Sequence, residues 1–158
     1  MASMRDIKRR KGSISSTQQI TKAMKLVSTV KLQRAKGKAE TTKPYFDCMY
    51  ETIATMLSKS DNVDHPYLKT GKSAKKAVIV ITSNRGLAGG YNNNVVKLVT
   101  GEESFSKEDV EIYALGKKGK DSLAGKGYVI AQELSDVMNA PMYSDAKALS
   151  DRLLERFE

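Results

Sequence analysis

Cysteine, histidine and tryptophan are nearly absent from this 158-residue chain, which has one, one and none of them, respectively. The single cysteine, Cys48, excludes an internal disulfide framework and fits a reducing compartment. With His65 as the one histidine, a histidine-based metal site or catalytic triad is disfavoured. No apolar run approaches the roughly 20 residues that a membrane-spanning helix needs. The remaining composition, 40% hydrophobic and 28% charged, is typical of one globular domain.

Acidic residues are scarce at the N-terminal end. Residues 1–43 contain twelve Lys or Arg and two acids, a net charge of +10, although the whole chain carries +9. All of the excess positive charge therefore lies in the first segment. Such a segment binds nucleic acid, an anionic membrane or an acidic protein surface, and charge alone leaves these three open.

The first 60 residues are predicted to form one long helical element, because they contain few helix breakers and their apolar residues recur at helical spacing. The first run forms a heptad seam of Ile20, Ala23, Val27 and Val30. A second run follows the same period at Phe46, Met49, Tyr50, Ile53, Met56 and Leu57. Pro44 lies between the two runs and is expected to kink or divide the helix. A helix of this length with a narrow apolar stripe needs a partner helix.

The nature of the stripe helps to choose among partners for the basic segment. The first aromatic residue of the chain is Tyr45, so the basic segment before it has no ring that could stack on a base. This argues against nucleic acid as its partner. The apolar face is narrow and has no Trp or Phe before Phe46, which argues against binding of this segment to a membrane surface. The pattern is best explained by a long helix that pairs with a second helix through its apolar stripe and faces an acidic protein surface.

Residues 61–76 are polar and are predicted to be a linker, and residues 77–158 are predicted to alternate strands and helices. The predicted strands are 77–82, which should be buried, 110–115 and 128–131. The predicted helices are 93–99, 117–124 and 145–157, the last with Ser144 as its N-cap. This alternation indicates a small α/β domain with a mostly parallel sheet.

Two glycine motifs invite a phosphate-binding interpretation. Gly71-Lys72-Ser73 lacks the first glycine of a P-loop and precedes its strand, so we reject it. The loop at residues 81–94 does follow a strand, but its glycines match neither GxGxxG nor GxxxxGK[ST]. A tight strand-to-helix turn is the simpler interpretation of this loop, and nucleotide binding stays open as the alternative.

The remaining polar features favour solvated structure over catalysis. Asp64-His65 fits a solvated turn, and Cys48 fits packing or surface exposure better than a nucleophile. The lysine-rich GKKGK at residues 116–120 fits a solvated helix start. The sequence therefore offers no catalytic residues.

Two longer stretches carry a family resemblance. One is MRDIKRRKGSISSTQQITKAMKLVSTVKLQRA at residues 4–35, and the other is ITSNRGLAGGYNNNV at residues 81–95. Together, and in this order, they resemble the γ subunit of the F-type ATP synthases, the central stalk of a rotary motor. The resemblance extends along the whole chain. It implies a long N-terminal coiled-coil helix (1–60), followed by a linker (61–76) and a Rossmann-like three-layer α/β domain (77–158).

The same resemblance implies partners and contact residues. The helix would form half of an antiparallel coiled coil inside the ring of α and β subunits, and the domain would lie beside ε and the membrane c-ring. Lys22, Met24 and Lys25 fall where the family's helix approaches β. The loop contact would comprise Arg85, Gly86, Gly89 and Gly90. The family's γ subunit has no catalytic site, cofactor, metal, nucleic acid or small-molecule substrate of its own. It acts peripherally, here at the cytoplasmic face of a bacterial membrane.

The chain departs from the family pattern in two respects. Asn84 stands where the family more often has aspartate, which removes a charge beside Arg85. These residues also contain no second shaft helix, so we expect an incomplete domain and self-association through the unpaired stripe. The alternative to a stalk subunit is a free-standing nucleotide-binding α/β module with a basic nucleic-acid-binding arm.

Overall fold

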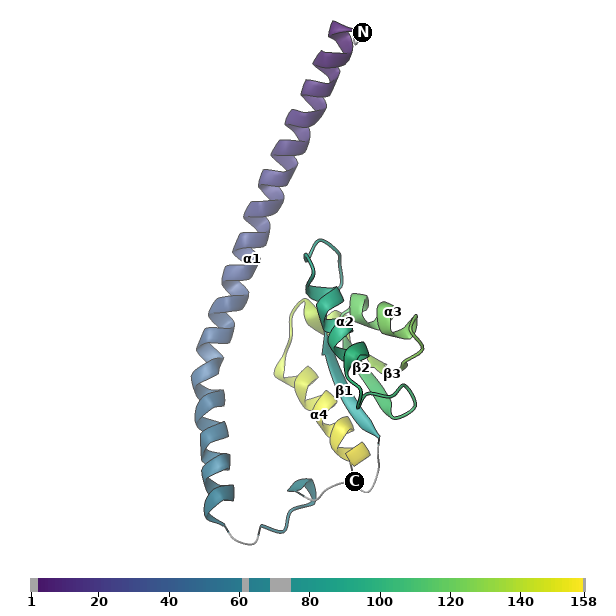
Figure 1. Cartoon of the computed structure of the whole chain (residues 1–158). Coiled ribbons are helices and arrows are strands. Elements are labelled where there is room, and N and C mark those ends of the chain that lie inside the picture. Colours follow the sequence, from purple (N-terminus) through teal and green to yellow (C-terminus); the bar gives the residue numbers. More distant parts are fainter. Residues whose placement is uncertain (1–2, 61–62, 69–74, 158) are drawn as a thin grey trace. The chain divides into compact units, whose positions relative to one another are not determined.

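The computed structural model describes residues 3–60, 63–68 and 75–157. The chain divides into two compact units, Met1–Val63 and Asp64–Glu158. The first unit is a helix and the second is an α/β unit (Figure 1). The predicted fold class, a long N-terminal helix followed by an α/β domain with a parallel sheet, is confirmed.

Helix α1 runs without a break over Met4–Lys59, which is 56 residues. At 1.5 Å per residue it is about 84 Å long. Ser3 is its N-cap, since the Ser3 hydroxyl accepts a hydrogen bond from the Arg5 amide at 3.3 Å. Asp6 in the first turn and Lys59 in the last complement the helix dipole.

The helix continues through Pro44, so of the two effects expected at this residue, a kink or a division, the division is excluded. Proline removes one amide donor and leaves the Glu40 carbonyl without its helical partner. Because α1 has no buried residue, that carbonyl can be hydrated instead. The ion pair between Lys43 and Asp47, at 2.7 Å, spans the proline and supports the helix there.

The second unit is built on a three-stranded parallel sheet in the order β1-β2-β3. The strands are β1 (Lys76–Ile81), β2 (Val110–Leu115) and β3 (Val129–Glu133). The helices are α2 (Tyr91–Gly101), α3 (Lys117–Ala124) and α4 (Tyr143–Phe157), with short 3-10 helices at Pro66–Leu68 and Asp136–Met138. In the register, Val78 faces Ile112 and Ile112 faces Ile130.

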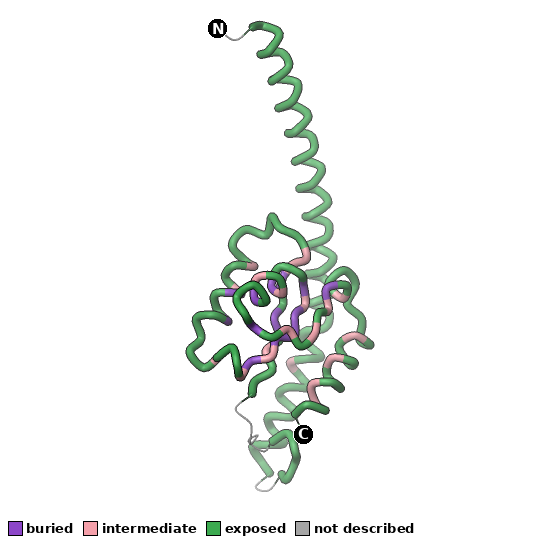
Figure 2. Tube along the Cα trace, turned by 90° about the vertical axis from the view of Figure 1, so that its right-hand side faces the viewer, coloured by how far each residue is buried: buried purple, intermediate pink, exposed green. Residues whose placement is uncertain are grey.

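The core lies between one face of this sheet and helices α2 and α3. Its buried residues are Val80, Val96, Val99, Val110, Ile112, Ala114, Leu123 and Tyr128. Figure 2 shows that buried residues gather in the α/β unit, whereas α1 is exposed along nearly its whole length. Strand β2 is the central strand and the most completely buried one.

Helix α4 belongs to the opposite face of the sheet, which completes the three layers. Its Arg156 pairs with Glu111 of β2, whose side chain points away from the Ile112 face. Tyr113 is buried on the same face as Glu111. The ring of Phe157 meets that of Tyr67 at 5.9 Å between centroids.

Two local expectations are corrected. Strand β1 was expected to be buried, but only Val80 in it is, and Ile79 and Ile81 are about half exposed. The reason is that Ile79 and Ile81 alternate with Val80 along the strand, so they lie on the face of β1 opposite the core, where the described residues cover them only in part. Ser144 is not the N-cap of α4, which begins one residue earlier. Instead the Asp145 carboxylate accepts a hydrogen bond from the Met142 amide at 2.9 Å.

Candidate functional site

The apolar seam of α1 is exposed to solvent throughout. Ile20, Val27 and Val30 are 61%, 57% and 38% exposed, and Ala23 is also exposed. The second apolar run, around Phe46 to Leu57, is exposed in the same way. Two exposed apolar runs on one helix are more than the scattered apolar residues of an ordinary surface. Within the described residues, nothing covers it.

The same helix is strongly cationic. No acidic residue occurs between Asp6 and Glu40, whereas ten Lys or Arg do. Lys22 and Lys25 are exposed, and no carboxylate of the described residues lies within ion-pair distance of either. Met24 is 54% exposed and borders the seam, one turn from Ile20. The helix therefore presents an apolar stripe with a cationic flank.

The second candidate surface is the loop between β1 and α2, which starts from a tightly packed strand end. Thr82, 1% exposed, accepts a hydrogen bond from the Gly119 amide at 2.8 Å and donates one to the Gly116 carbonyl at 3.2 Å. A Cβ at Gly116 would lie 2.0 Å from the Thr82 carbonyl oxygen, and Gly116 has a φ of 109°. Only glycine fits here, so the first residue of the loop is locked to α3.

Sequence reasoning treated the glycines of residues 116–120 as part of a solvated helix start. The structure instead places Gly116 and Gly119 in direct contact with Thr82. A Cβ at Gly119 would approach the Thr82 hydroxyl at 2.7 Å. The spacing of two glycines at the start of a helix, after a strand, was the available signal for this close strand–helix approach.

Two asparagines fix the ends of the loop. The side-chain oxygen of Asn92, in the first turn of α2, accepts from the Ser83 amide at 3.0 Å, and its Nδ2 donates to the Ser83 hydroxyl at 2.7 Å. Asn84 accepts from the Lys117 amide at 3.1 Å and donates to the Ser135 carbonyl at 2.7 Å. A side chain that both donates and accepts is needed at position 84 for this geometry. Asparagine therefore ties the loop to the segments that follow β2 and β3.

The tip of the loop contains Gly86, Leu87, Ala88 and Gly89. Leu87 has a φ of 64°, which is uncommon for any residue other than glycine, asparagine or aspartate. Its side chain is 96% exposed. Gly89 also has a positive φ, of 56°, and the Tyr91 amide donates to the Ala88 carbonyl at 3.3 Å as α2 begins.

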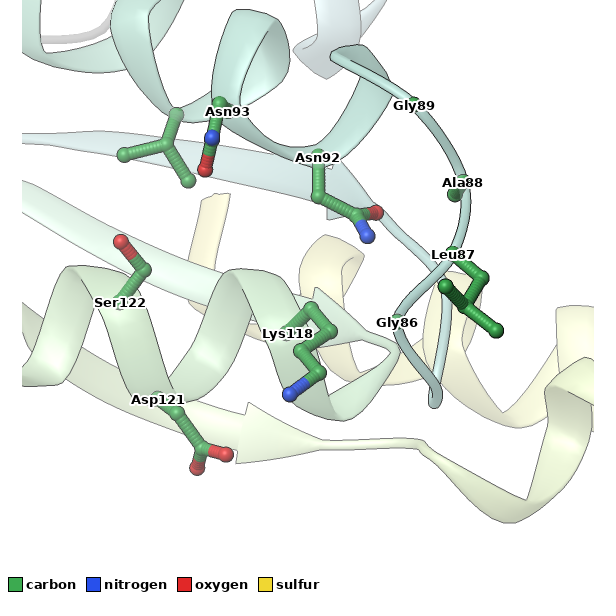
Figure 3. Close-up of a pocket in the computed structure, with 10 residues that line it drawn as sticks. Gly86, Leu87, Ala88, Gly89, Asn92, Asn93, Lys118, Asp121 and Ser122 are labelled. Carbon is green, nitrogen blue, oxygen red and sulfur yellow. The ribbon is translucent and has the colours of Figure 1, made fainter. Parts of the chain in front are cut away.

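A cavity of about 460 Å³ lies beneath the loop, between it, the start of α2 and α3. Its lining includes Gly86, Gly89 and Asn92, together with Lys118 and Asp121 of α3 (Figure 3). One cation and one anion thus share the cavity, so its charge is balanced. Of the four loop residues predicted as contacts, Gly86 and Gly89 line this cavity, whereas Arg85 and Gly90 are exposed outside its lining.

A charged pair lies at the strand ends beside this loop. The Lys120 ammonium is 2.8 Å from the Glu133 carboxylate, which also accepts a hydrogen bond from the Ser135 hydroxyl at 2.6 Å. The hydrogen bond from Lys120 and that from Ser135 hold the pKa of Glu133 below its ordinary value. The same hydrogen bond raises the pKa of Lys120. Both groups are therefore charged at neutral pH.

The other polar features of the sequence do not assemble with either surface. The His65 ring lies against Tyr67, at 4.9 Å between centroids, and His65 Nδ1 accepts from the Tyr67 amide at 3.3 Å. Cys48 is a free, exposed thiol on α1. Gly71-Lys72-Ser73 lies outside the described residues. Within the described residues, no three His, Cys, Asp or Glu side chains are grouped as metal ligands, and no helix there is long and apolar enough to cross a bilayer.

Comparison with known proteins adds a family assignment to this geometry. The family model described as ATP synthase matches residues 3–158. The ATP synthase gamma chain of Lachnoclostridium phytofermentans is 65% identical over 157 residues, which cover 99% of this chain and 54% of that protein. The gamma chain of Alkaliphilus metalliredigens is 42% identical over 155 residues, covering 98% of this chain and 53% of the relative.

A third relative, the ATP synthase gamma chain of Brevibacillus brevis, is 37% identical over 158 residues, with 98% of this chain and 55% of the relative covered. Similarity therefore runs along both units of the chain rather than over one motif. The chain spans about half the length of the curated relatives it matches.

Proposed function

The chain belongs to the gamma-chain family of the ATP synthases, and from this premise we propose that it is part of the central stalk of a proton-translocating F-type ATP synthase. In this proposal residues 1–60 are one half of the coiled-coil shaft, 61–76 are a linker and 77–158 belong to the base domain. The stalk couples proton-driven rotation of the membrane c-ring to ATP synthesis on the ring of α and β subunits. It lies at the cytoplasmic face of a bacterial membrane, beside the ε subunit, and performs no chemistry of its own.

The observation that carries the proposal is the exposed apolar and cationic surface of α1. A helix of 56 residues with no buried residue has no source of tertiary stability within the described chain. Its apolar stripe fits a second helix, which would cover Ile20, Ala23, Val27 and Val30 as a coiled-coil seam. Its cationic flank fits acidic surfaces of neighbouring subunits.

The proposed coupling is mechanical and depends on differential contact. As the shaft turns, it meets each β subunit in a different conformation, and the difference in contact free energy shifts the nucleotide affinity of that subunit. Lys22, Met24 and Lys25 are proposed to make this contact on the shaft. Arg85, with the glycines of its loop, is proposed to make a second contact nearer the base.

Mixing the chain with the α and β subunits of the Lachnoclostridium phytofermentans ATP synthase tests the proposal directly. Light scattering of the purified product should give a ring of three α and three β subunits that carries one copy of the chain. Met24→Lys places a further charge at the proposed contact and should weaken this association, whereas Thr55→Lys, at an exposed position near the other end of α1, should not. A ring without the chain would contradict the proposal.

The nucleotide-binding alternative has its own test. Equilibrium dialysis with ATP would detect binding in the cavity lined by Lys118 and Asn92. A salt-dependent oligonucleotide titration would detect a nucleic-acid-binding role of α1. Binding weaker than about millimolar in both would remove this alternative.

A further inference from the structure

One segment of α1, residues 37–44, has a weakened hydrogen-bond ladder. Two threonine hydroxyls in it donate to carbonyls of the preceding turn, Thr41 to Gly37 at 2.9 Å and Thr42 to Lys38 at 3.1 Å and Ala39 at 3.2 Å. The next carbonyl, that of Glu40, has no helical amide to accept from, because residue 44 is proline. Four consecutive carbonyls are therefore either shared with a hydroxyl or left without their helical partner.

Each of these features favours bending of the helix at this segment. A hydroxyl that bonds to the carbonyl one turn earlier competes with the backbone amide and often bends a helix. Proline adds a steric clash with the preceding turn, and Gly37 adds backbone freedom. Elsewhere in the described part of α1 such bonds reach isolated carbonyls, as from Thr21 to Thr17 at 2.8 Å and from Thr29 to Lys25 at 2.9 Å. Figure 1 shows α1 curved rather than straight, with its ribbon continuous through residues 37–44.

The same segment separates two apolar runs that lie on different faces of α1. Continuing the heptad spacing of the seam beyond Val30 leads to positions without a large apolar side chain: Arg34, Gly37, Thr41, Pro44, Cys48 and Glu51. Val27 of the first run and Ile53 of the second are 26 residues apart, which places them about 80° apart around a straight helix. A straight partner helix covers one narrow seam, so it cannot lie over both runs of a straight α1.

From the weakened ladder and the change of face we infer that residues 37–44 are a hinge, at which α1 bends and turns between two stiffer halves. Bending there disrupts few intact hydrogen bonds, because the four carbonyls are already shared or unpaired. Water can bond to the carbonyls that bending opens, since α1 has no buried residue. Each half can then turn its own apolar run toward the same partner helix.

The hinge is inferred from α1 alone. Its use in a coiled-coil shaft, where the partner would be a second shaft helix, rests on the proposed function. A hinge between the two runs would let the shaft keep both of them covered although they are out of heptad register.

Double electron–electron resonance tests the hinge, because it measures the distribution of distances between two spin labels on the full chain. One pair of labels spans the hinge, at Gln33→Cys and at the native Cys48, which is exposed. The control pair does not span it and is placed at Gln18→Cys and Gln33→Cys in a Cys48→Ser background. Both pairs are 15 residues apart, about 22 Å along a helix, so a uniform helix would give them the same distribution. An excess of unlabelled chain removes distances between separate copies.

We expect the distribution across the hinge to be about twice as wide as that of the control pair and to extend to shorter distances, because bent conformers bring the labels together. Replacing Gly37, Thr41, Thr42 and Pro44 together by alanine restores a regular ladder and should narrow the distribution to the width of the control.

Equal widths of the two pairs in the chain with its hinge intact would overturn the inference. A hinge-spanning width that the four alanine substitutions leave unchanged would overturn it as well, because the breadth would then have another source. Both results concern the chain alone and leave the stalk proposal standing, since assembly with the α and β subunits decides that proposal. Conversely, a chain that does not join the ring but shows the expected widths would keep its hinge and lose only the stalk assignment.

Discussion

At the scale of single residues, Gly116 is a position where a side chain as small as one Cβ atom cannot be accommodated. A Cβ there would meet the Thr82 carbonyl at 2.0 Å, and the φ of 109° is itself unfavourable for other residues. We expect Gly116→Ala to lower the free energy of unfolding by about 3 kcal/mol or more, measured by urea denaturation. Gly86→Ala is the control, and it should change stability by less than about 0.5 kcal/mol because its Cβ meets nothing. Equal effects of the two substitutions would contradict the close packing of Thr82 against Gly116.

The pair of Lys120 and Glu133 should make stability depend on pH in a defined direction. The folded-state pKa of Glu133 is lowered, so its contribution is present above the ordinary carboxyl pKa of about 4.3 and is lost as pH falls through the folded value. The folded-state pKa of Lys120 is raised, so the contribution is also lost as pH rises through that value, above the ordinary lysine pKa of about 10.4. Between these limits wild type should melt slightly higher than Glu133→Gln.

The measurement is the melting temperature of both proteins from pH 8 down to pH 3, which passes below the ordinary carboxyl pKa of about 4.3. The difference between them should be small, because the pair is partly exposed, and should vanish in acid. Glu103→Gln is the control, since Glu103 is exposed and forms no ion pair within the described residues. If the melting temperature of wild type rose further above that of Glu133→Gln as pH falls, the result would contradict a stabilising ion pair between Lys120 and Glu133.

At the scale of elements, the least expected feature is an undivided α1 that contains Pro44. Proline in a helix interior is about 3 kcal/mol less favourable than alanine. Pro44→Ala should therefore raise the temperature at which α1 loses its helical circular dichroism signal, and Ala39→Pro should lower it. An unchanged signal in Pro44→Ala would mean that the helix is already interrupted at this residue in solution.

Element prediction from the sequence succeeded where local pattern decides structure and failed where neighbours decide it. The predicted strand at 110–115 and helix at 117–124 match β2 and α3, because both are set by hydrophobic period and a glycine boundary. The apolar run at 77–82 predicts a strand correctly but does not show how completely each of its two faces is covered. Its expected burial was therefore wrong. Likewise, the sequence left open whether Pro44 kinks or divides the helix, because a hydrated helix can leave one carbonyl unpaired.

At the scale of the whole molecule, the exposed seam of α1 predicts self-association of the isolated chain. Burying Ile20, Val27 and Val30 between two copies removes apolar area from water, at about 25 cal/mol per Å². Sedimentation velocity should therefore show larger species as concentration rises. Val27→Lys should shift the chain toward monomer, whereas Leu32→Lys, which lies off the seam, should not. A wild-type chain that stays monomeric at every concentration would contradict the prediction.

The sequence by itself determined the features that depend on neighbours along the chain. These are the long helix with its apolar seam, its positive charge, the alternation of strands and helices, and the two stretches that resemble the γ family. Charge and periodicity are local properties, so they can be read without coordinates. The predicted contact residues on α1 and in the loop follow from the family resemblance and stay proposals.

Only the tertiary structure decided the features that join distant segments. Thr82 meets Gly116 and Gly119, and Asn84 reaches Ser135, across separations of more than thirty residues. The left-handed conformation and near-complete exposure of Leu87 follow from those contacts, because they fix the ends of its loop. Glycine spacing can signal a close approach, but periodicity and composition do not say which distant segment is approached, since such contacts arise when the ends of parallel strands are brought to one edge of the sheet.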